Sequence, residues 1–131
     1  MFAQMARRSR NDRFVPNTDL SLSEDGERLL VQVEVAGAEA KSLRVAVEDR
    51  SLYITGRREG DAPWSRGSYL LKEIEYGSFE RKIHLPMHVD QREAAARYAD
   101  GILSIALPIV ANPEFPVVRT EIRLILKRVS P

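Results

Sequence analysis

The chain has two histidines and no cysteine, and the histidines are poorly placed for catalysis or metal binding. His84 and His88 are four residues apart, the spacing of a helical zinc site, but Pro86 lies between them and His84 belongs to a strand-like run. Surface histidines are therefore the better interpretation. The stretch GRREGDAPWSRGS lacks the Lys-Ser/Thr end of a phosphate-binding loop, and no serine lies in a G-x-S-x-G turn. We expect no enzyme, no metal site and no cofactor.

Composition limits the classes of partner. The chain has 131 residues, 20 Lys and Arg against 19 Asp and Glu, and no cysteine. A net charge of +1 gives no electrostatic reason to expect nucleic acid or an anionic membrane as a partner. No apolar run approaches the roughly 20 residues of a membrane span, and the arginines near the N-terminus precede no apolar signal segment. We expect one soluble, cytoplasmic domain.

The elements that would position any site are strands, because apolar residues recur with a period of two. Short runs of this kind, separated by turn residues, are typical of an all-β sandwich. Four runs each place large apolar side chains on one face: Leu29, Val31, Val33 and Val35; Leu43, Val45 and Val47; Leu52 and Ile54; and Phe79, Ile83 and Leu85. Asp49-Arg50 is a turn between the second and third runs.

A further hairpin is predicted where a helix is the competing interpretation. QREAAARYA is rich in helix formers, but Asp100-Gly101 between alternating residues is the stronger signal, since both turn positions favour positive φ. The turn would set up these cross-strand pairs, with the apolar side chains on one face: Ala99 with Ile102, Tyr98 with Leu103, Ala96 with Ile105 and Ala94 with Leu107. The sequence therefore predicts two strands here.

Two segments and a tail fall outside this sandwich. Residues 58–68 form a loop rich in Gly, Pro and charge, and residues 111–117 form a linker with two prolines. After the linker, residues 118–128 alternate apolar and charged side chains. Such an amphipathic tail needs a surface on which to lie.

Two motifs and one longer run carry a family resemblance. AAARYADGIL resembles the signature A-x-x-x-(N/D)-G-(V/I)-L, and EIEYGSFERKIHLP resembles a pattern of Glu, Gly, Phe, Arg and Leu-Pro. The run VEVAGAEAKSLRVAVEDRSLYITGRR fits a strand–Gly–strand–strand order that ends in I-x-G-x-R. On these residues the chain resembles the small heat-shock proteins, whose core is the α-crystallin domain, over about residues 15–108.

The resemblance implies an ATP-independent chaperone that holds unfolding client proteins in soluble complexes. It also implies an immunoglobulin-like β-sandwich that forms homodimers, in some members by exchanging a strand from the long loop, and a C-terminal motif that docks on a neighbouring dimer. We expect an N-terminal arm over 1–14, the α-crystallin domain over 15–110 and a C-terminal extension over 111–131. The short arm leaves an alternative, an assembly, adaptor or co-chaperone module on the same sandwich.

The tail and a groove form the first candidate site. Ile122 and Leu124 are two residues apart, so they project to the same side of an extended chain, and Leu124 with Leu126 is a second such pair. The groove is expected between two strands, one carrying Leu43, Val45 and Val47 and one carrying Ala94, Ala96 and Tyr98. The resemblance favours docking on another subunit, and the alternative is a further strand of the chain's own domain.

A dimer interface is the second candidate site. Arg81 is in phase with the apolar residues of its strand, so alternation points a charge inward, where it needs a partner. The resemblance favours an ion pair with Glu73 or another carboxylate of a partner chain over an intradomain salt bridge or a bulge. Trp64 either folds back on its own domain or lies in a loop that crosses to the partner, with Tyr69 and Leu70 as the added edge strand.

The N-terminal arm is the third candidate site. Its large apolar residues are Phe2, Met5 and Phe14. Adaptable Met and Phe side chains suit the binding of unfolded clients. The alternative is a frayed chain end with no binding role.

Overall fold

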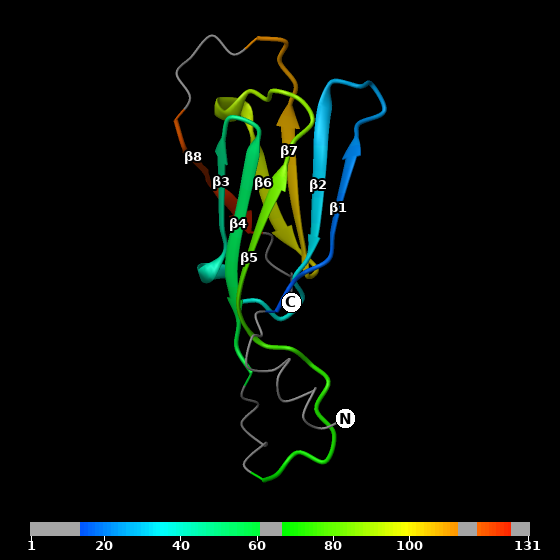
Figure 1. The fold of residues 1–131 in the computed structure, drawn as a ribbon, viewed down its shortest axis with the longest axis vertical. Coiled ribbons are helices and arrows are strands. Elements are labelled where there is room, and N and C mark those ends of the chain that lie inside the picture. Colours follow the sequence, from blue (N-terminus) through cyan, green and yellow to red (C-terminus); the bar gives the residue numbers. More distant parts are fainter. Residues whose placement is uncertain (1–13, 61–66, 113–117, 127–131) are drawn as a thin grey trace.

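The computed structural model of the chain describes residues 14–60, 67–112 and 118–126, and it has the predicted all-β sandwich architecture (Figure 1). The described residues include two short 3-10 helices, η1 (Ala40–Ser42) and η2 (Gln91–Glu93). The strands are β1 (Thr18–Leu22), β2 (Arg28–Glu34), β3 (Arg44–Glu48), β4 (Ser51–Arg58), β5 (Gly77–His84), β6 (Ala95–Ala99), β7 (Ile102–Pro108), β8 (Thr120–Ile122) and β9 (Leu124–Leu126).

The strands form two sheets that pack face to face. Sheet A has the order β1-β2-β7-β6-β9, and sheet B has the order β5-β4-β3-β8. The ladders are antiparallel except between β6 and β9, which run parallel. The last two strands come from the C-terminal tail, and each extends a different sheet.

The core lies between the sheets and consists of the residues that the period-two pattern predicts. The apolar side chains of the four predicted runs are buried, except for Ile83, which is half-buried. Strand β7 adds Leu103, Ile105 and Leu107 to the same cluster. Removal of this apolar area from water, worth roughly 25 cal/mol per Å², is the main force that holds the two sheets together.

The two tight hairpins have the register that their turn residues predict. Asp100 and Gly101 have φ angles of 54° and 78°, and Asp49 has a φ of 55° at the turn between β3 and β4. The β6–β7 ladder has the predicted pairs, Ala99 with Ile102, Tyr98 with Leu103 and Ala96 with Ile105. The predicted pairing of Ala94 with Leu107 is wrong, because Ala94 is the C-cap residue after η2 and the ladder begins at Ala95 with Ala106.

Strand β1 is an element that the alternation pattern does not predict. Its Leu20 and Leu22 lie opposite Val31 and Leu29 of β2, and so face the interior side of sheet A. They nevertheless remain 40% and 51% exposed, because β1 is the outermost strand of the sheet. Sheet A therefore has an unpaired edge at β1 among the described residues.

Candidate docking groove and interface segments

The predicted groove lies along one side of the sandwich, between β3 of sheet B and β6 of sheet A. The C-terminal tail crosses from one strand to the other (Figure 1). Strand β8 pairs with β3, with Ile122 opposite Val45, and β9 pairs with β6, with Leu124 opposite Ala96. Only Arg123 separates β8 from β9. The tail therefore hydrogen-bonds to both sheets and closes this side of the sandwich.

The two apolar residues at the crossing point both face the interior. Ile122 is 5% exposed and belongs to the core cluster, and the half-buried Leu124 packs against it. Leu126 is 48% exposed. Ile122 and Leu124 are thus the pair that fills the groove. They reach it from two different strands, one in each sheet, rather than from one continuous strand.

The groove residues are a continuation of the core. Leu43, Val45, Val47 and Ala96 are buried, and Ala94 and Tyr98 are half-buried against the same cluster. The Tyr98 hydroxyl donates a hydrogen bond to the Val35 carbonyl oxygen at 3.1 Å, and burial raises the pKa of the Tyr98 phenol. The small Ala96 side chain leaves the depth that Leu124 occupies.

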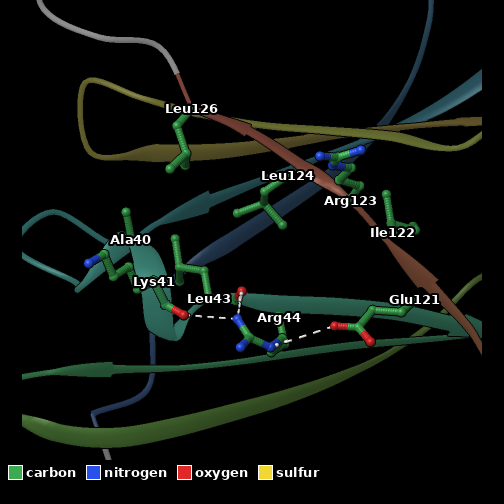
Figure 2. Close-up of a pocket in the computed structure, with 9 residues that line it drawn as sticks. All are labelled: Ala40, Lys41, Leu43, Arg44, Glu121, Ile122, Arg123, Leu124 and Leu126. Carbon is green, nitrogen blue, oxygen red and sulfur yellow. Dashed lines mark hydrogen bonds and ion pairs between the residues drawn. The ribbon is translucent and has the colours of Figure 1, made fainter.

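A cavity of about 410 Å³ remains beside the docked tail (Figure 2). It is lined by Ala40, Lys41, Leu43, Arg44, Glu121, Ile122, Arg123, Leu124 and Leu126. The apolar side chains of Ala40 in η1 and of Leu43, directly before β3, lie across it from those of the tail, and charged side chains lie around it. The groove therefore has room for more apolar volume than the tail fills.

The structure describes one chain, and within it the tail lies in the chain's own groove. The family resemblance favours a groove on another subunit. The linker that leads into the tail includes residues 113–117, which lie outside the described residues. Docking between subunits therefore stays a prediction.

Arg81 lies on the interior side of sheet B, opposite Ile54, as its phase along β5 predicts. Its Nη1 donates a hydrogen bond to the Pro16 carbonyl oxygen at 2.8 Å. Among the described residues it makes no ion pair, and Glu73 is exposed on the segment before β5. In the described part of the chain, a backbone carbonyl rather than a carboxylate meets this charge.

The segment that leads into β5, residues 67–76, extends beyond the lower end of the sandwich (Figure 1). Its apolar side chains are exposed: Tyr69 by 54%, Leu70 by 101%, Leu71 by 72% and Ile74 by 60%. Trp64, the other predicted interface residue, lies outside the described residues. The segment has no regular secondary structure and does not pair with either sheet of its own chain.

Phe14 covers the lower end of the core instead of projecting into solvent. Its ring meets the buried Phe79 ring edge-on at 5.7 Å, and the Arg58 guanidinium lies 3.6 Å from the Phe14 ring centre. Arg58 also donates hydrogen bonds to the carbonyl oxygens of Ala36 and Glu75. Phe2 and Met5 lie outside the described residues.

Arg58 is a structural residue that sequence reasoning did not single out. It joins the N-terminal segment, the turn after β2 and the segment before β5 through one guanidinium. The available signal was its place as the final Arg of the I-x-G-x-R pattern. Spacing alone gives no sign of three separate partners.

The described residues offer little for chemistry. His88 Nδ1 lies 3.3 Å from an Asp49 carboxylate oxygen, whereas His84 is on β5 opposite Ser51. Within residues 14–60, 67–112 and 118–126, no three His, Asp or Glu side chains gather as metal ligands would. No helix in these ranges has the length and apolarity that crossing a membrane requires. The geometry offers apolar docking surfaces.

Comparison with known proteins connects this arrangement to one family. Residues 21–123 match the model of the Hsp20/alpha crystallin family. The chain is 32% identical over 100 residues to small heat shock protein C2 of Rickettsia felis, an alignment that covers 76% of this chain and 64% of that protein. It is 36% identical over 93 residues to small heat shock protein C4 of the same organism, covering 71% and 56%. The chain thus spans less than two thirds of the length of these relatives.

The fold has a counterpart among solved structures. Heat shock protein 16.0 from Schizosaccharomyces pombe superposes with a TM-score of 0.67 and 21% identity, covering 91% of this chain and 99% of that chain. The family to which these proteins belong consists of chaperones rather than enzymes, in agreement with the sequence expectation. Because the family match runs from β1 through the groove strands into the docked tail, the chain belongs to the Hsp20/alpha crystallin family of small heat-shock proteins.

Proposed function

We propose that this chain is an ATP-independent cytoplasmic chaperone that binds unfolding proteins through exposed apolar surface and prevents their aggregation. The observation that carries this proposal is the apolar run at Tyr69, Leu70, Leu71 and Ile74, where each side chain is more than half exposed. Contiguous exposed apolar side chains mark interaction sites, because folded soluble proteins otherwise bury or disperse them. Membership of a chaperone family supports the same activity.

Apolar contact explains how such a surface acts without a fixed recognition sequence. Each Å² of apolar area removed from water contributes roughly 25 cal/mol, whatever the side chain that covers it. An unfolding client exposes many apolar segments, so several weak contacts add up to a stable complex. No reaction or nucleotide is needed in such a mechanism.

We also propose that in the dimer at rest segment 67–76 adds a strand to a partner chain, with Tyr69 and Leu70 in the added strand, and that the segment meets a client when it is released from that partner. The edge of β1 supports this, because Leu20 and Leu22 are partly exposed there and, among the residues that the structure describes, β1 pairs with β2 alone. In the same arrangement Arg81 would pair with Glu73 of the partner chain, in place of or beside its Pro16 contact.

Docking of the tail between subunits is the remaining part of the proposal. The complementarity of Ile122 and Leu124 to the groove supports it, since the same groove exists on every copy of the chain. A chain that ends at Asn112 should then form dimers only, whereas the full chain forms larger assemblies. Light scattering coupled to size exclusion measures both masses, and equal masses would contradict docking between subunits.

The holdase proposal is tested by heating an aggregation-prone model client with the full chain in the absence of nucleotide. Near-stoichiometric chain should suppress light scattering by the client. A Leu70→Asp and Leu71→Asp double variant should suppress it less, while Ser68→Asp, an exposed charge on the same segment, should leave suppression intact. Failure of the unaltered chain to suppress aggregation would favour the alternative, an assembly or adaptor module.

The dimer proposal has a separate test at Arg81. Arg81→Ala should raise the dimer dissociation constant measured by sedimentation, because an interface charge loses its partner. Lys82→Ala serves as the control, since Lys82 is exposed and its side chain lies on the opposite face of β5. An unchanged dimer in the Arg81 variant would count against an interface role.

A further inference from the structure

The docked tail carries charges on its outward side that match charges on β3. In the β3–β8 ladder Glu121 lies opposite Ala46, on the face away from the core. Its carboxylate is 3.6 Å from Arg44 Nε. Arg119, two residues earlier, has its Nε 3.9 Å from a Glu48 carboxylate oxygen, and its guanidinium lies 4.2 Å from the ring centre of Tyr53.

The Arg44 side chain is held in position by its own segment. Its Nη1 donates hydrogen bonds to the carbonyl oxygens of Lys41 at 2.9 Å and Leu43 at 3.1 Å (Figure 2). Its Nε remains directed at Glu121, as the dashed line in Figure 2 shows. A guanidinium restrained in this way loses less side-chain entropy when it meets an acidic partner.

These charges disfavour one alternative register that the apolar residues allow. Side chains on a strand alternate, so a shift of the tail by two residues would keep Ile122 and Leu124 facing inward. Shifted in one direction, the tail would place Glu121 opposite Glu48, and like charges directly across a ladder are destabilising. The observed register instead gives Arg119 and Glu121 each a partner of opposite charge on β3.

We propose that Arg44, Glu48 and Tyr53 form a selection strip, a set of side chains that favours tails of matching charge. A matching tail has an acidic residue directly before the position of Ile122 and a basic residue two positions before that acidic residue. The occupant is the tail of a second copy of this chain, which carries Arg119 and Glu121 at these positions. This rests on the proposed docking between subunits. Exposed ion pairs contribute little singly, so selection comes from the pairs together and from repulsion of mismatched tails.

The test uses full-length chains and measures amide hydrogen exchange over residues 118–126. Glu48→Arg and Arg119→Glu should each speed exchange roughly threefold to tenfold, because an attraction becomes a repulsion. The double variant should return exchange to within about twofold of the unaltered chain. Arg123→Glu is the matched control, since Arg123 is exposed and makes no ion pair among the described residues, and it should leave exchange nearly unchanged.

A mixture of the two single variants identifies the occupant. Each variant alone has a mismatched tail and groove, but the Arg119→Glu tail matches the Glu48→Arg groove of the other chain, and the converse holds too. Restored protection in the mixture supports selection between copies. If the double variant restores protection but the mixture does not, docking between subunits is contradicted, and charge matching acts only between a tail and the groove of its own chain. Single variants that do not change exchange, or a double variant without rescue, would overturn the selection strip.

Discussion

Replacing Ile122 by Ala should release the tail from the groove. Ile122 is 5% exposed and packs in the core, so the change deletes three buried carbon atoms. At roughly 0.8 kcal/mol per buried methylene, the loss is about 2.4 kcal/mol, near the low end of the 2–5 kcal/mol range for large-to-small core changes. The tail holds only two three-residue strands, so this loss should be a large part of its docking free energy.

Amide hydrogen exchange over residues 118–126 of the full chain reports docking directly. A loss of about 2.4 kcal/mol corresponds to roughly fiftyfold faster exchange of the docked amides, up to the limit set by a fully released tail. Ile125→Ala is a matched control, because it deletes the same atoms from the same tail at a side chain that is 63% exposed. Its effect should stay below about twofold.

Equal exchange rates in the two variants would refute this reasoning. Such a result would mean that the apolar contact of Ile122 does not hold the tail, and that backbone pairing alone does so. A fall in global thermal stability much larger than the docking energy would also contradict the account, because the β6–β7 and β3–β4 hairpins do not include the tail.

Two further predictions concern the sandwich. Gly56→Ala should destabilise the fold by about 1–3 kcal/mol in thermal or denaturant unfolding, because a Cβ there would lie 2.6 Å from the Phe79 ring, whereas Gly67→Ala, with nothing within 4 Å, should be near neutral. Burial raises the pKa of Tyr98, so its contribution to stability is present below about pH 10 and is lost as pH rises through the folded-state pKa. Tyr98→Phe removes the hydrogen bond to the Val35 carbonyl, so its free energy of unfolding at pH 7 should be about 0.5–1.5 kcal/mol lower. Between pH 9 and 11 the urea midpoint of the variant should fall less steeply than that of the unaltered chain. Equal slopes in the two proteins would contradict this.

The hairpins and the core could be predicted because their determinants are local. Asp100-Gly101 specifies a two-residue turn, and a two-residue turn specifies the register of both strands. Once the register is known, the strict alternation of Val31, Val33 and their neighbours decides which side chains are buried. Position along the sequence and side-chain type are sufficient for these features.

The crossing of the tail between sheets could not be predicted in the same way. Alternation through Ile122, Leu124 and Leu126 suggests one strand, whereas the tail changes sheets at Arg123. That change depends on the distance between β3 and β6, which is a property of the assembled sandwich. Strand β1 could not be predicted for a related reason: Leu20 lies on an edge strand, where partial exposure does not require alternating apolar and polar residues.

The position of Phe14 depends on long-range contacts as well. In sequence it is an aromatic residue at the end of a basic arm, which suits client binding. In the fold its ring lies between Arg58 and Phe79 at the lower end of the core. A client-binding role for Phe14 would require this contact to open.

The proposed function is that the chain binds unfolding proteins through exposed apolar surface and performs no reaction on them. The most direct measurement heats a labelled model client with the full chain, without nucleotide, and determines by size exclusion with light scattering where the client elutes. The account predicts soluble complexes that contain both polypeptides at a mass above either alone. Client found only in the pellet, with the chain eluting at its own unchanged mass, would contradict it.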